Sequence, residues 1–456
     1  MASRFYVETL GCPKNEVDSE KLVGTLLAQG LTATDDESQA DVVVVNTCAF
    51  IEEARKESID TIMALSERRK TGARLVVTGC MAERYGDELR ANLPEADQIA
   101  GFGVAIETGV SAAANAATST AVALGKKPSL NVTSQAVPSF DLLNLPRPAS
   151  KTPWAYVKIA EGCDRTCGFC AIPSFRGPQR SRDVASILRE VDELHAKEIV
   201  LVAQDLASYG KDRPEELGAG AIVDLVNAVA AKVRRTRLLY LYPSDLSDEL
   251  IEAILASGVP YFDLSLQHVS KPHLRRMRRW GDGERFLKRI ADIRSREPQS
   301  AFRSNFIVGY PGETEDDHDQ LLSFVHDASL DWCGFFEYSP EEGTYAVNLP
   351  DQVPAGLMHE RIAELRQLQD DITAAKRDEL IDETLEVLVD EPGVGRSHRE
   401  APQIDGVVRV SPSLATGSFA KVRIIDALGP DLVAEGGEAT DTDSGDASHD
   451  GARHAG

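Results

Sequence analysis

The sequence has no long hydrophobic run and no segment that resembles a secretion signal. Its longest strand-like apolar stretch covers residues 42–45, whereas a membrane-spanning helix needs about 20 apolar residues. Residues 1–10 lack the basic and apolar segments of a signal peptide. These absences argue for a cytoplasmic protein with no membrane partner.

Positive charge is also scarce. The chain of 456 residues has 49 Lys and Arg against 73 Asp and Glu, so its formal net charge is -24. A chain of this charge repels phosphate backbones unless its basic residues are clustered, and it attracts basic proteins. The common alternative is that the acidity serves only solubility.

The cysteine count is odd, which fits a disulfide framework poorly. In a long cytosolic chain, cysteines are more often metal ligands or catalytic thiols than disulfide partners. The seven are Cys12, Cys48, Cys80, Cys163, Cys167, Cys170 and Cys333.

The length predicts more than one domain. Residues 1–110 alternate strand and helix patterns and predict a small α/β domain with a parallel sheet. Its expected strands cover residues 4–10, 41–46 and 74–78, and its expected helices cover 16–29 and 51–70. Residues 111–150 are rich in Ala, Ser, Thr and Pro and predict a linker with one short helix near 111–116.

Residues 151–380 repeat a strand-then-helix unit and predict an incomplete (β/α) barrel with its chemistry at the carboxyl ends of the strands. The expected strands cover residues 155–159, 198–202, 238–241, 262–266, 302–308 and 332–338, and a helix over 359–383 closes the domain. Residues 381–437 predict a small all-β barrel of the oligonucleotide-binding kind, with strands at 385–390, 405–410 and 420–426. Residues 438–456 predict a disordered acidic tail.

Three cysteines share one position relative to the predicted strands. Cys12, Cys48 and Cys80 each stand one or two residues after a strand of the first domain. Ligands in open α/β sheets bind at the carboxyl ends of the strands, so we expect these thiols to converge on a metal or a cluster. The alternative is three buried structural cysteines.

Cys163, Cys167 and Cys170 form a C-x3-C-x2-C motif directly after the first barrel strand. Three cysteines in one tight loop can hold three irons of a 4Fe-4S cube and leave the fourth iron open for chemistry. Phe169 would shield such a cluster from water. The alternative is a structural zinc site, but such sites usually have four ligands, and no fourth Cys or His stands nearby.

This motif, after a strand that opens a (β/α) barrel, resembles the radical S-adenosylmethionine superfamily. The resemblance implies that S-adenosylmethionine chelates the open iron, and that one electron cleaves it to a radical that abstracts hydrogen from an unactivated carbon. It also implies that Gln204 and the loop with Gly309, Gly312 and Glu313 contact this cofactor. A plain Gly-Pro turn is the alternative for that loop.

The upstream cysteine trio and the downstream β module resemble the methylthiotransferases of that superfamily, whose β module is called TRAM-like. The resemblance implies that Cys12, Cys48 and Cys80 hold a second 4Fe-4S cluster, which carries or activates the inserted sulfur. A second S-adenosylmethionine would supply the methyl group, and an electron donor such as a flavodoxin or ferredoxin would reduce the enzyme. Cys333 has no such role, and we interpret it as buried packing.

Two branches of this family differ in substrate: one modifies an aspartate of the small-subunit ribosomal protein S-twelve (RimO type), and the other an isopentenyladenosine in transfer RNA. The transfer-RNA branch usually has Gln-Ser where Gln267-His268 stand and Gln-Asn where Gln204-Asp205 stand. Six stretches resemble the RimO type: Tyr156-Val-Lys-Ile-Ala-Glu-Gly-Cys163, Ile172-Pro-Ser-Phe-Arg-Gly177, Ala203-Gln-Asp205, Leu239-Tyr-Leu-Tyr-Pro243, Leu266-Gln-His268 and Tyr338-Ser-Pro-Glu-Glu-Gly-Thr344.

Charge favours the same branch. Residues 378–435 contain 12 acidic and 5 basic residues, a balance of -7, whereas a module that grips RNA should be basic. We therefore expect a methylthiotransferase whose substrate is the basic ribosomal protein. The alternatives are the transfer-RNA enzyme and, from another class, a non-catalytic iron–sulfur or zinc scaffold.

Three further features are interpreted as ordinary. The basic run Arg275, Arg276, Arg278 and Arg279 is typical of a solvated helix face, with contact to RNA or to a substrate carboxylate as the alternative. Gly101-Phe-Gly103 lacks the third glycine of a dinucleotide-binding motif and predicts a turn. His195 and His273 are expected at the surface.

Overall fold

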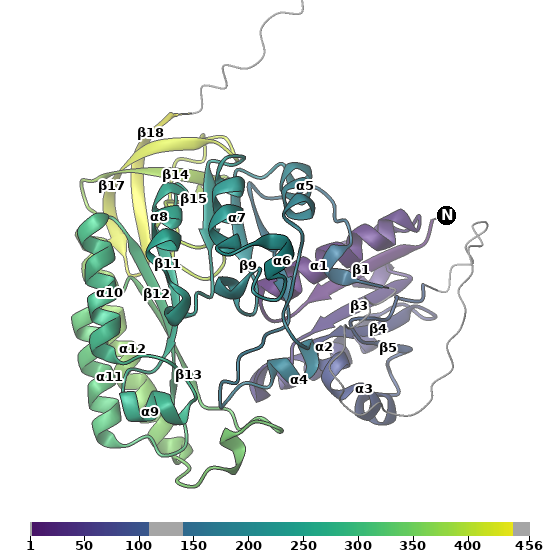
Figure 1. Ribbon diagram of the computed structural model, residues 1–456. Helices are drawn as coiled ribbons and strands as arrows, with labels where there is room; N and C mark the ends of the chain where they lie inside the picture. The colour runs from purple at the N-terminus through teal and green to yellow at the C-terminus, as the bar shows by residue number, and fades with distance from the viewer. Residues whose placement is uncertain (1, 109–139, 441–456) are drawn as a thin grey trace, which may run out of the picture.

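A computed structural model describes residues 2–108 and 140–440 of the chain. The expected short helix near 111–116 and most of the expected tail therefore lie outside the described residues. Figure 1 shows the N-terminal α/β domain beside a central half-barrel of strands and helices, with the C-terminal strands packed at one end of that half-barrel. None of the described helices is long and apolar enough to cross a membrane.

The N-terminal domain is a parallel sheet in the order β2-β1-β3-β4-β5. Every residue of β3 is buried, as expected for a nearly all-valine strand with both faces covered. The strands are β1 (Arg4–Thr9), β2 (Thr32–Ala33), β3 (Val42–Thr47), β4 (Arg74–Gly79) and β5 (Gln98–Ala100); the helices are α1 (Pro13–Ala28), η1 (Glu37–Gln39), α2 (Glu52–Arg68) and α3 (Cys80–Asn92). The expected fold of this domain is therefore confirmed.

The central domain contains two three-stranded parallel sheets, β10-β9-β6 and β11-β12-β13, joined by a bridge between Leu241 and Leu264. Together they form the expected incomplete barrel. The strands are β6 (Trp154–Lys158), β9 (Glu198–Val202), β10 (Arg235–Leu238), β11 (Tyr261–Gln267), β12 (Ala301–Val308) and β13 (Trp332–Glu337).

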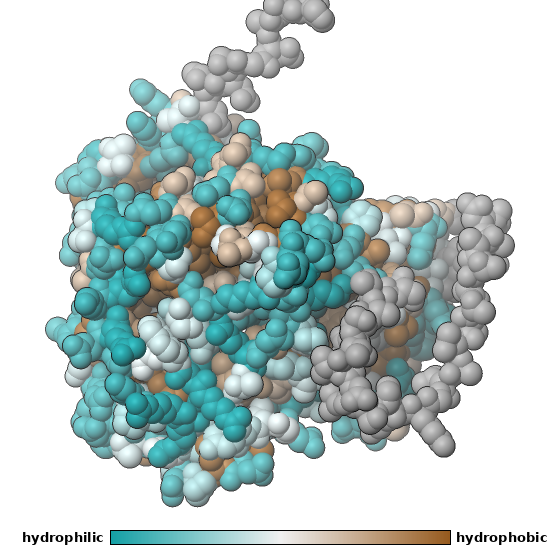
Figure 2. All heavy atoms as spheres, in the orientation of Figure 1, coloured by the Kyte–Doolittle hydropathy of each residue, from teal (hydrophilic) through white to brown (hydrophobic). Residues whose placement is uncertain are grey.

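Helices cover the outer face of this half-barrel (Figure 1). They are α5 (Val184–Leu194), α7 (Ala221–Ala230), α8 (Asp248–Ala256), α10 (Gly283–Arg296), α11 (Glu315–Ala328) and α12 (Ala355–Asp378). Short elements fill the loops: η2 (Leu142–Asn144), β7 (Ala160–Glu161), α4 (Ile172–Arg176), β8 (Arg180–Ser181), η3 (Leu206–Ser208), α6 (Pro214–Leu217), η4 (Pro243–Asp245), α9 (Lys271–Arg276) and η5 (Ala346–Asn348). The face in Figure 2 is mostly hydrophilic, with hydrophobic side chains gathered near α7.

One strand begins earlier than the hydrophobic pattern indicated. We expected the third barrel strand at residues 238–241, but β10 begins three residues earlier and ends at Leu238. Its first three residues, Arg235, Thr236 and Arg237, are all buried. The pattern failed here because these arginines enter the core as ion-pair partners, which the sequence alone does not show.

The C-terminal module is a closed barrel in the order β14-β15-β16-β18-β17. Its strands are β14 (Thr384–Glu391), β15 (Val394–Arg396), β16 (Val408–Arg409), β17 (Phe419–Leu428) and β18 (Asp431–Ala439). The last strand was missed, because Glu435, Gly436 and Gly437 interrupt its apolar pattern. Pairing of Ala420 with Ala439 nevertheless extends β18 into the first residues of the expected tail.

A buried ion cluster joins this module to the half-barrel. Glu198 on β9 accepts hydrogen bonds from Arg237 Nε at 2.7 Å and from Arg396 Nη1 of the module at 3.2 Å. Arg235 donates to the carbonyl of Arg396 at 2.9 Å. Burial opposes ionisation of Glu198, but the surrounding arginines dominate and lower its pKa to about 2.

We predict that Glu198→Gln destabilises the protein by about 3–5 kcal/mol, because the substitution leaves buried arginines without their counter-charge. A carboxylate with a depressed pKa stabilises fully above its unfolded pKa, near 4.3, and loses that contribution as the pH falls toward its folded value. The difference in Tm between wild type and variant should therefore narrow from about pH 5 to about pH 3. Calorimetry across that range is the measurement. Glu193→Gln, on the exposed side of α5, is the control with no expected effect, and a pH-independent difference would contradict the assignment.

Candidate cluster sites at the domain junction

The three N-terminal cysteines stand at the carboxyl ends of three adjacent parallel strands. Cys12 precedes α1, Cys48 follows β3, and Cys80 begins α3 directly after β4. A Cβ atom placed on Gly11 would lie only 2.9 Å from the sulfur of Cys48. The loops that carry Cys12 and Cys48 are therefore in contact at this edge of the sheet.

Asn15, which no sequence pattern pointed to, holds these loops together. This fully buried side chain donates to the carbonyl of Leu10 at 2.9 Å and to the carbonyl of Thr47 at 3.0 Å. Its Oδ1 lies 3.6 Å from Cys80 Sγ. One amide therefore contacts the segments that carry all three cysteines.

The second trio lies in the loop after β7. The N–H of Cys163 donates to the carbonyl of Gly177 at 3.1 Å, and the N–H of Gly168 donates to the carbonyl of Met277 at 2.8 Å. Two nitrogen donors reach the sulfurs: the backbone N–H of Arg165 lies 3.4 Å from Cys163 Sγ, and Arg279 Nη1 lies 3.4 Å from Cys167 Sγ. The loop is thus fixed by backbone bonds, and its thiols receive one hydrogen bond from within the loop and one from Arg279.

Without a bound metal, burial keeps four of these six thiols protonated. Burial, with a smaller contribution from nearby cysteines of the same trio, raises the pKa of Cys48 to about 12, of Cys163 to about 11 and of Cys170 to about 12. Burial likewise raises the pKa of Cys80. Metal binding at these positions must therefore displace protons.

Neither trio brings its three sulfurs close enough together to surround a single ion. Within the described residues, the one group of three Cys, His, Asp or Glu ligand atoms that lie within 4.8 Å of one another contains no cysteine. A zinc ion with Zn–S bonds of about 2.3 Å would need its sulfurs within about 4.6 Å of one another. Three thiols that each bind a different iron can stand farther apart, and three per site leave one iron of a 4Fe-4S cube open.

The two sites face each other across the domain junction. Lys14, two residues after Cys12, places its Nζ 3.4 Å from the ring centre of Tyr240, just beyond β10. Arg176, on α4 just after the second trio, donates from Nη2 to Cys80 Sγ at 2.9 Å. The carboxyl ends of the N-terminal sheet and of the half-barrel therefore meet.

The basic run at 275–279 is only partly a solvated face. Arg275, Arg276 and Arg278 are exposed, but Arg279 is buried and reaches Cys167. The guanidinium carbons of Arg279 and Arg165 each lie 3.9 Å from the ring centre of Tyr242. The expectation was wrong for Arg279, because α9 ends at Arg276 and the following turn directs this side chain inward.

The residues expected at the S-adenosylmethionine pocket fall into two groups. Phe169 packs against the barrel core, and Gln204 donates from Nε2 to Glu161 Oε1 at 2.7 Å. Among the described residues, the buried Oε1 of Gln204 has no hydrogen-bond partner.

Gly309, Gly312 and Glu313 form the second group, in the loop after β12. Glu313 accepts from the N–H of Gly309 at 2.6 Å and from Arg361 Nη1 at 2.9 Å. A Cβ on Gly309 would overlap Met358, and a Cβ on Gly312 would overlap the guanidinium of Arg276. Both neighbours are flexible side chains that could move, so it is the positive φ angles, 83° at Gly309 and 79° at Gly312, that favour glycine at these positions.

Comparison with known proteins identifies the family. Three family models match successive parts of the chain: the uncharacterized protein family UPF0004 at residues 4–101, the radical SAM superfamily at 157–325 and the TRAM domain at 378–436. The chain is 41% identical over 441 residues to the ribosomal protein uS12 methylthiotransferase RimO of Moorella thermoacetica, covering 92% of this chain and 96% of that protein. The chain belongs to the RimO family of radical SAM methylthiotransferases.

Other matches extend this result. RimO of Myxococcus xanthus is 41% identical over 451 residues, covering 94% of this chain and 91% of the relative. A solved structure of the radical SAM methyltransferase TsrM from Kitasatospora setae matches with a TM-score of 0.46 and 13% identity, covering 91% of this chain and 84% of that chain. RimO enzymes use S-adenosylmethionine and two 4Fe-4S clusters, so the expected cofactors are confirmed.

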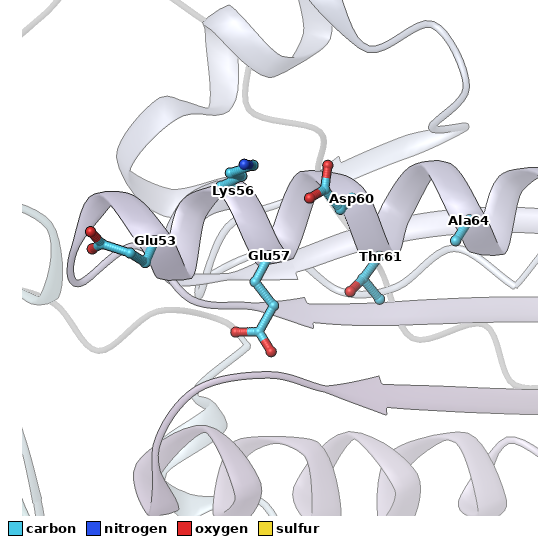
Figure 3. A pocket seen from close by; sticks show the side chains of 6 residues that line it. All are labelled: Glu53, Lys56, Glu57, Asp60, Thr61 and Ala64. Atoms are coloured by element: carbon cyan, nitrogen blue, oxygen red, sulfur yellow. The ribbon is translucent and has the colours of Figure 1, made fainter.

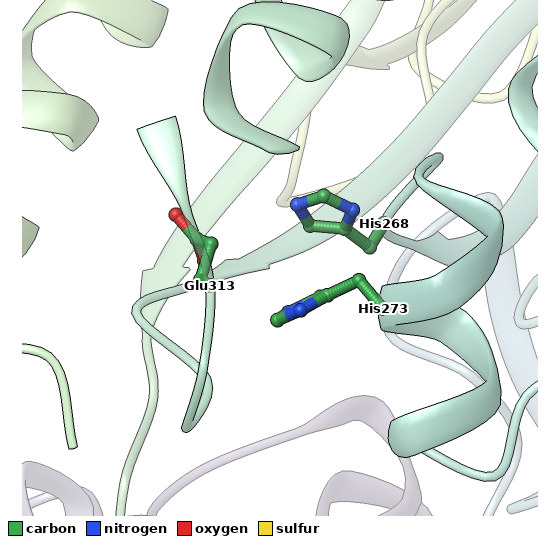
Figure 4. Close-up of side chains that lie close together, drawn as sticks. All are labelled: His268, His273 and Glu313. Carbon is green, nitrogen blue, oxygen red and sulfur yellow. The ribbon is translucent and has the colours of Figure 1, made fainter. Parts of the chain in front are cut away.

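Two buried histidines, His268 and His273, lie close together in this RimO chain. His268 follows β11, and His273 lies on α9 with its ring 4.4 Å from that of His268 and pointing, as Figure 4 shows, toward Glu313. We expected His273 at the surface, but it is buried, because the short helix turns it toward the barrel. Burial lowers the pKa of His268, and it lowers that of His273 to about 4, so both rings are neutral near pH 7.

His268, His273 and Glu313 are the group whose ligand atoms lie within 4.8 Å of one another among the described residues. Each carboxylate oxygen of Glu313 already accepts one hydrogen bond, from Gly309 or from Arg361, so a cation here would lie beside the positive charge of Arg361. A separate surface pocket, drawn in Figure 3, is lined by one helix, α2, between Glu53 and Ala64. It includes none of the cysteines, so it is not part of the RimO site.

We predict that Gly79→Ala loosens the N-terminal site. Gly79 has φ 90 and ψ -162, a region that only glycine enters readily, and a Cβ there would lie against Asn46 Oδ1 and 2.5 Å from the carbonyl oxygen of Thr47. Gly30→Ala is the matched control, since Gly30 has φ 86 but no atom within 4 Å of an added Cβ. Both should lose about 1–2 kcal/mol to backbone strain, and only Gly79→Ala should lose more. If Tm fell equally in the two variants, the prediction would be wrong, because the clash of the added Cβ with Asn46 and Thr47 would then cost nothing.

Proposed function

We propose that this chain methylthiolates the β-carbon of an aspartate in ribosomal protein uS12, the S-twelve protein of the small subunit. The observation that carries the proposal is the pair of thiol trios that face each other across the domain junction, each able to hold a cluster with one open iron. The 41% identity to enzymes named uS12 methylthiotransferase RimO supports the substrate.

The two trios take different roles in this proposal. Cys163, Cys167 and Cys170 hold the cluster that binds S-adenosylmethionine, and Cys12, Cys48 and Cys80 hold the cluster that bears the sulfur. When bound, these groups supply the substrate radical and the methylthio group.

The chain supplies the surroundings of these clusters. Arg165 and Arg279 hydrogen-bond the sulfurs of the first trio, and Phe169 shields that loop from water. The Oε1 of Gln204 accepts a hydrogen bond from S-adenosylmethionine. Gly309, Gly312 and Glu313 shape the loop on the other side of this pocket.

The surface of the TRAM module supports a basic protein as the partner. Of its acidic residues, Asp390, Glu400 and Asp405 pair with arginines inside the structure, and of its basic residues Arg396 and Arg399 are buried. Nine acidic and three basic residues are left in 378–435. This surface remains acidic, which favours a basic ribosomal protein over RNA.

The cellular setting follows from the substrate. An enzyme that modifies a ribosomal protein works in the cytoplasm. We expect a small electron-transfer protein, a flavodoxin or a ferredoxin, to supply the electron.

Iron content tests the ligand assignment. We predict that replacing Cys163, Cys167 and Cys170 together by Ala removes about half of the iron of the anaerobically reconstituted enzyme and abolishes S-adenosylmethionine cleavage. Replacing Cys12, Cys48 and Cys80 should remove the other half and abolish sulfur insertion while cleavage continues. Cys333→Ala is the control that should keep all the iron. If either triple variant kept all its iron, the assignment of that trio as cluster ligands would be wrong.

Mass spectrometry tests the substrate. Reduced enzyme with sulfide and S-adenosylmethionine is offered a uS12 peptide and a transfer-RNA anticodon stem-loop in the same reaction. We predict a methylthio mass gain on the target aspartate of the peptide and none on the RNA. A peptide with Asn in place of that Asp is the matched control and should stay unmodified. A gain on the RNA alone would overturn the assignment.

A further inference from the structure

Arg176 occupies an unusual position between the two cysteine sites. It is the last residue of α4, which follows the second trio in the chain, yet its guanidinium reaches the first trio. Nη2 donates to Cys80 Sγ at 2.9 Å and to Asn15 Oδ1 at 2.8 Å. The barrel domain therefore supplies a hydrogen bond to a cysteine of the N-terminal domain.

The other side of the guanidinium is held by acids. Nη1 donates to Glu161 Oε1 at 2.9 Å and to Asp18 Oδ2 at 3.2 Å. The ring of Phe102 covers the guanidinium, with its centre 4.2 Å from the guanidinium carbon. The side chain is only 3% exposed. Every direction in which it could rotate away from Cys80 is thus occupied.

The charge of Arg176 is secure in this setting. A guanidinium is always protonated in proteins, and the carboxylates of Glu161 and Asp18 balance its charge in this buried place. A permanent positive charge beside a ligand sulfur stabilises the more negative, reduced form of an iron–sulfur cluster. Hydrogen bonds to the sulfurs are among the main determinants of cluster potential.

We propose that Arg176 is a positioning residue that sets the reduction potential of the N-terminal cluster through its hydrogen bond to Cys80. This inference rests on the proposed function, because it requires a cluster on Cys12, Cys48 and Cys80. Arginine is suited to the position because its planar fork bonds a sulfur and an amide from one nitrogen while the second nitrogen bonds the acids. A lysine could satisfy only part of this set.

The test is a redox titration monitored by electron paramagnetic resonance. The full chain carries Ala at Cys163, Cys167 and Cys170, so that only the N-terminal cluster is present. We expect Arg176→Met to lower the ratio of reduced to oxidised cluster about tenfold at a given potential, a shift of about 59 mV to more negative values for one electron. Arg176→Lys, which keeps the charge and fills much of the volume, should shift less and provides the measurement if the Met variant does not fold.

Arg182→Met is the matched control. Arg182 is a buried arginine of the same domain that pairs with Glu190 and donates to the carbonyl of Lys158 at 2.9 Å. The Arg182→Met substitution should leave the reduction potential of the N-terminal cluster unchanged. A comparable shift in this control would attribute the effect to general destabilisation and overturn the proposal.

Two further outcomes distinguish a wrong ligand assignment from a wrong role for Arg176. If no cluster forms in the background protein, the ligand assignment fails and the proposed function fails with it. If the cluster forms and Arg176→Met has the potential of the unsubstituted background, the assignment stands and the inference about Arg176 is wrong.

Discussion

The structure depends on a buried ion cluster between the N-terminal domain and the half-barrel. Lys158 at the end of β6 pairs with Asp18 on α1 and lies 2.7 Å from Glu161, and Arg176 bonds both of these acids. Buried charges are costly unless their partners are in place, so this group is stable only when the domains are docked. Because α1 also carries Asn15, the same docking fixes the loops of Cys12, Cys48 and Cys80.

This arrangement explains why two parallel sheets serve one reaction. The carboxyl ends of parallel strands gather loops at one edge, and joining two such edges brings both thiol trios to the same domain junction. In the proposed reaction, both sites must approach one carbon of the substrate. A rigid junction held by paired charges meets that requirement better than a flexible linker, because a displacement of about 1 Å can cost a reaction a hundredfold.

The features that could be predicted from the sequence are those that depend on residues close together in the chain. Cysteines after strands and the C-x3-C-x2-C spacing depend on neighbouring residues, so the trios and the three-part architecture could be inferred. Asn15, Arg176 and Arg279 could not, because their partners lie far away in the chain: 96 residues separate Arg176 from Cys80, and 112 separate Arg279 from Cys167. The misplaced start of β10 has the same origin, since Arg237 enters the core only because Glu198 is there to meet it.

In the TRAM module, buried and exposed charges must be counted separately before net charge is used to infer a binding partner. Part of its acidity is internal: Asp405 meets Arg303 at 2.5 Å, and Glu400 meets Arg377. These pairs, with the cluster around Glu198, attach the module firmly to the half-barrel. The acidic residues left over are therefore presented from a fixed position relative to the cysteines. An acidic surface in a fixed place can orient a basic protein so that one of its loops enters the junction, whereas an RNA backbone would be repelled by the same surface.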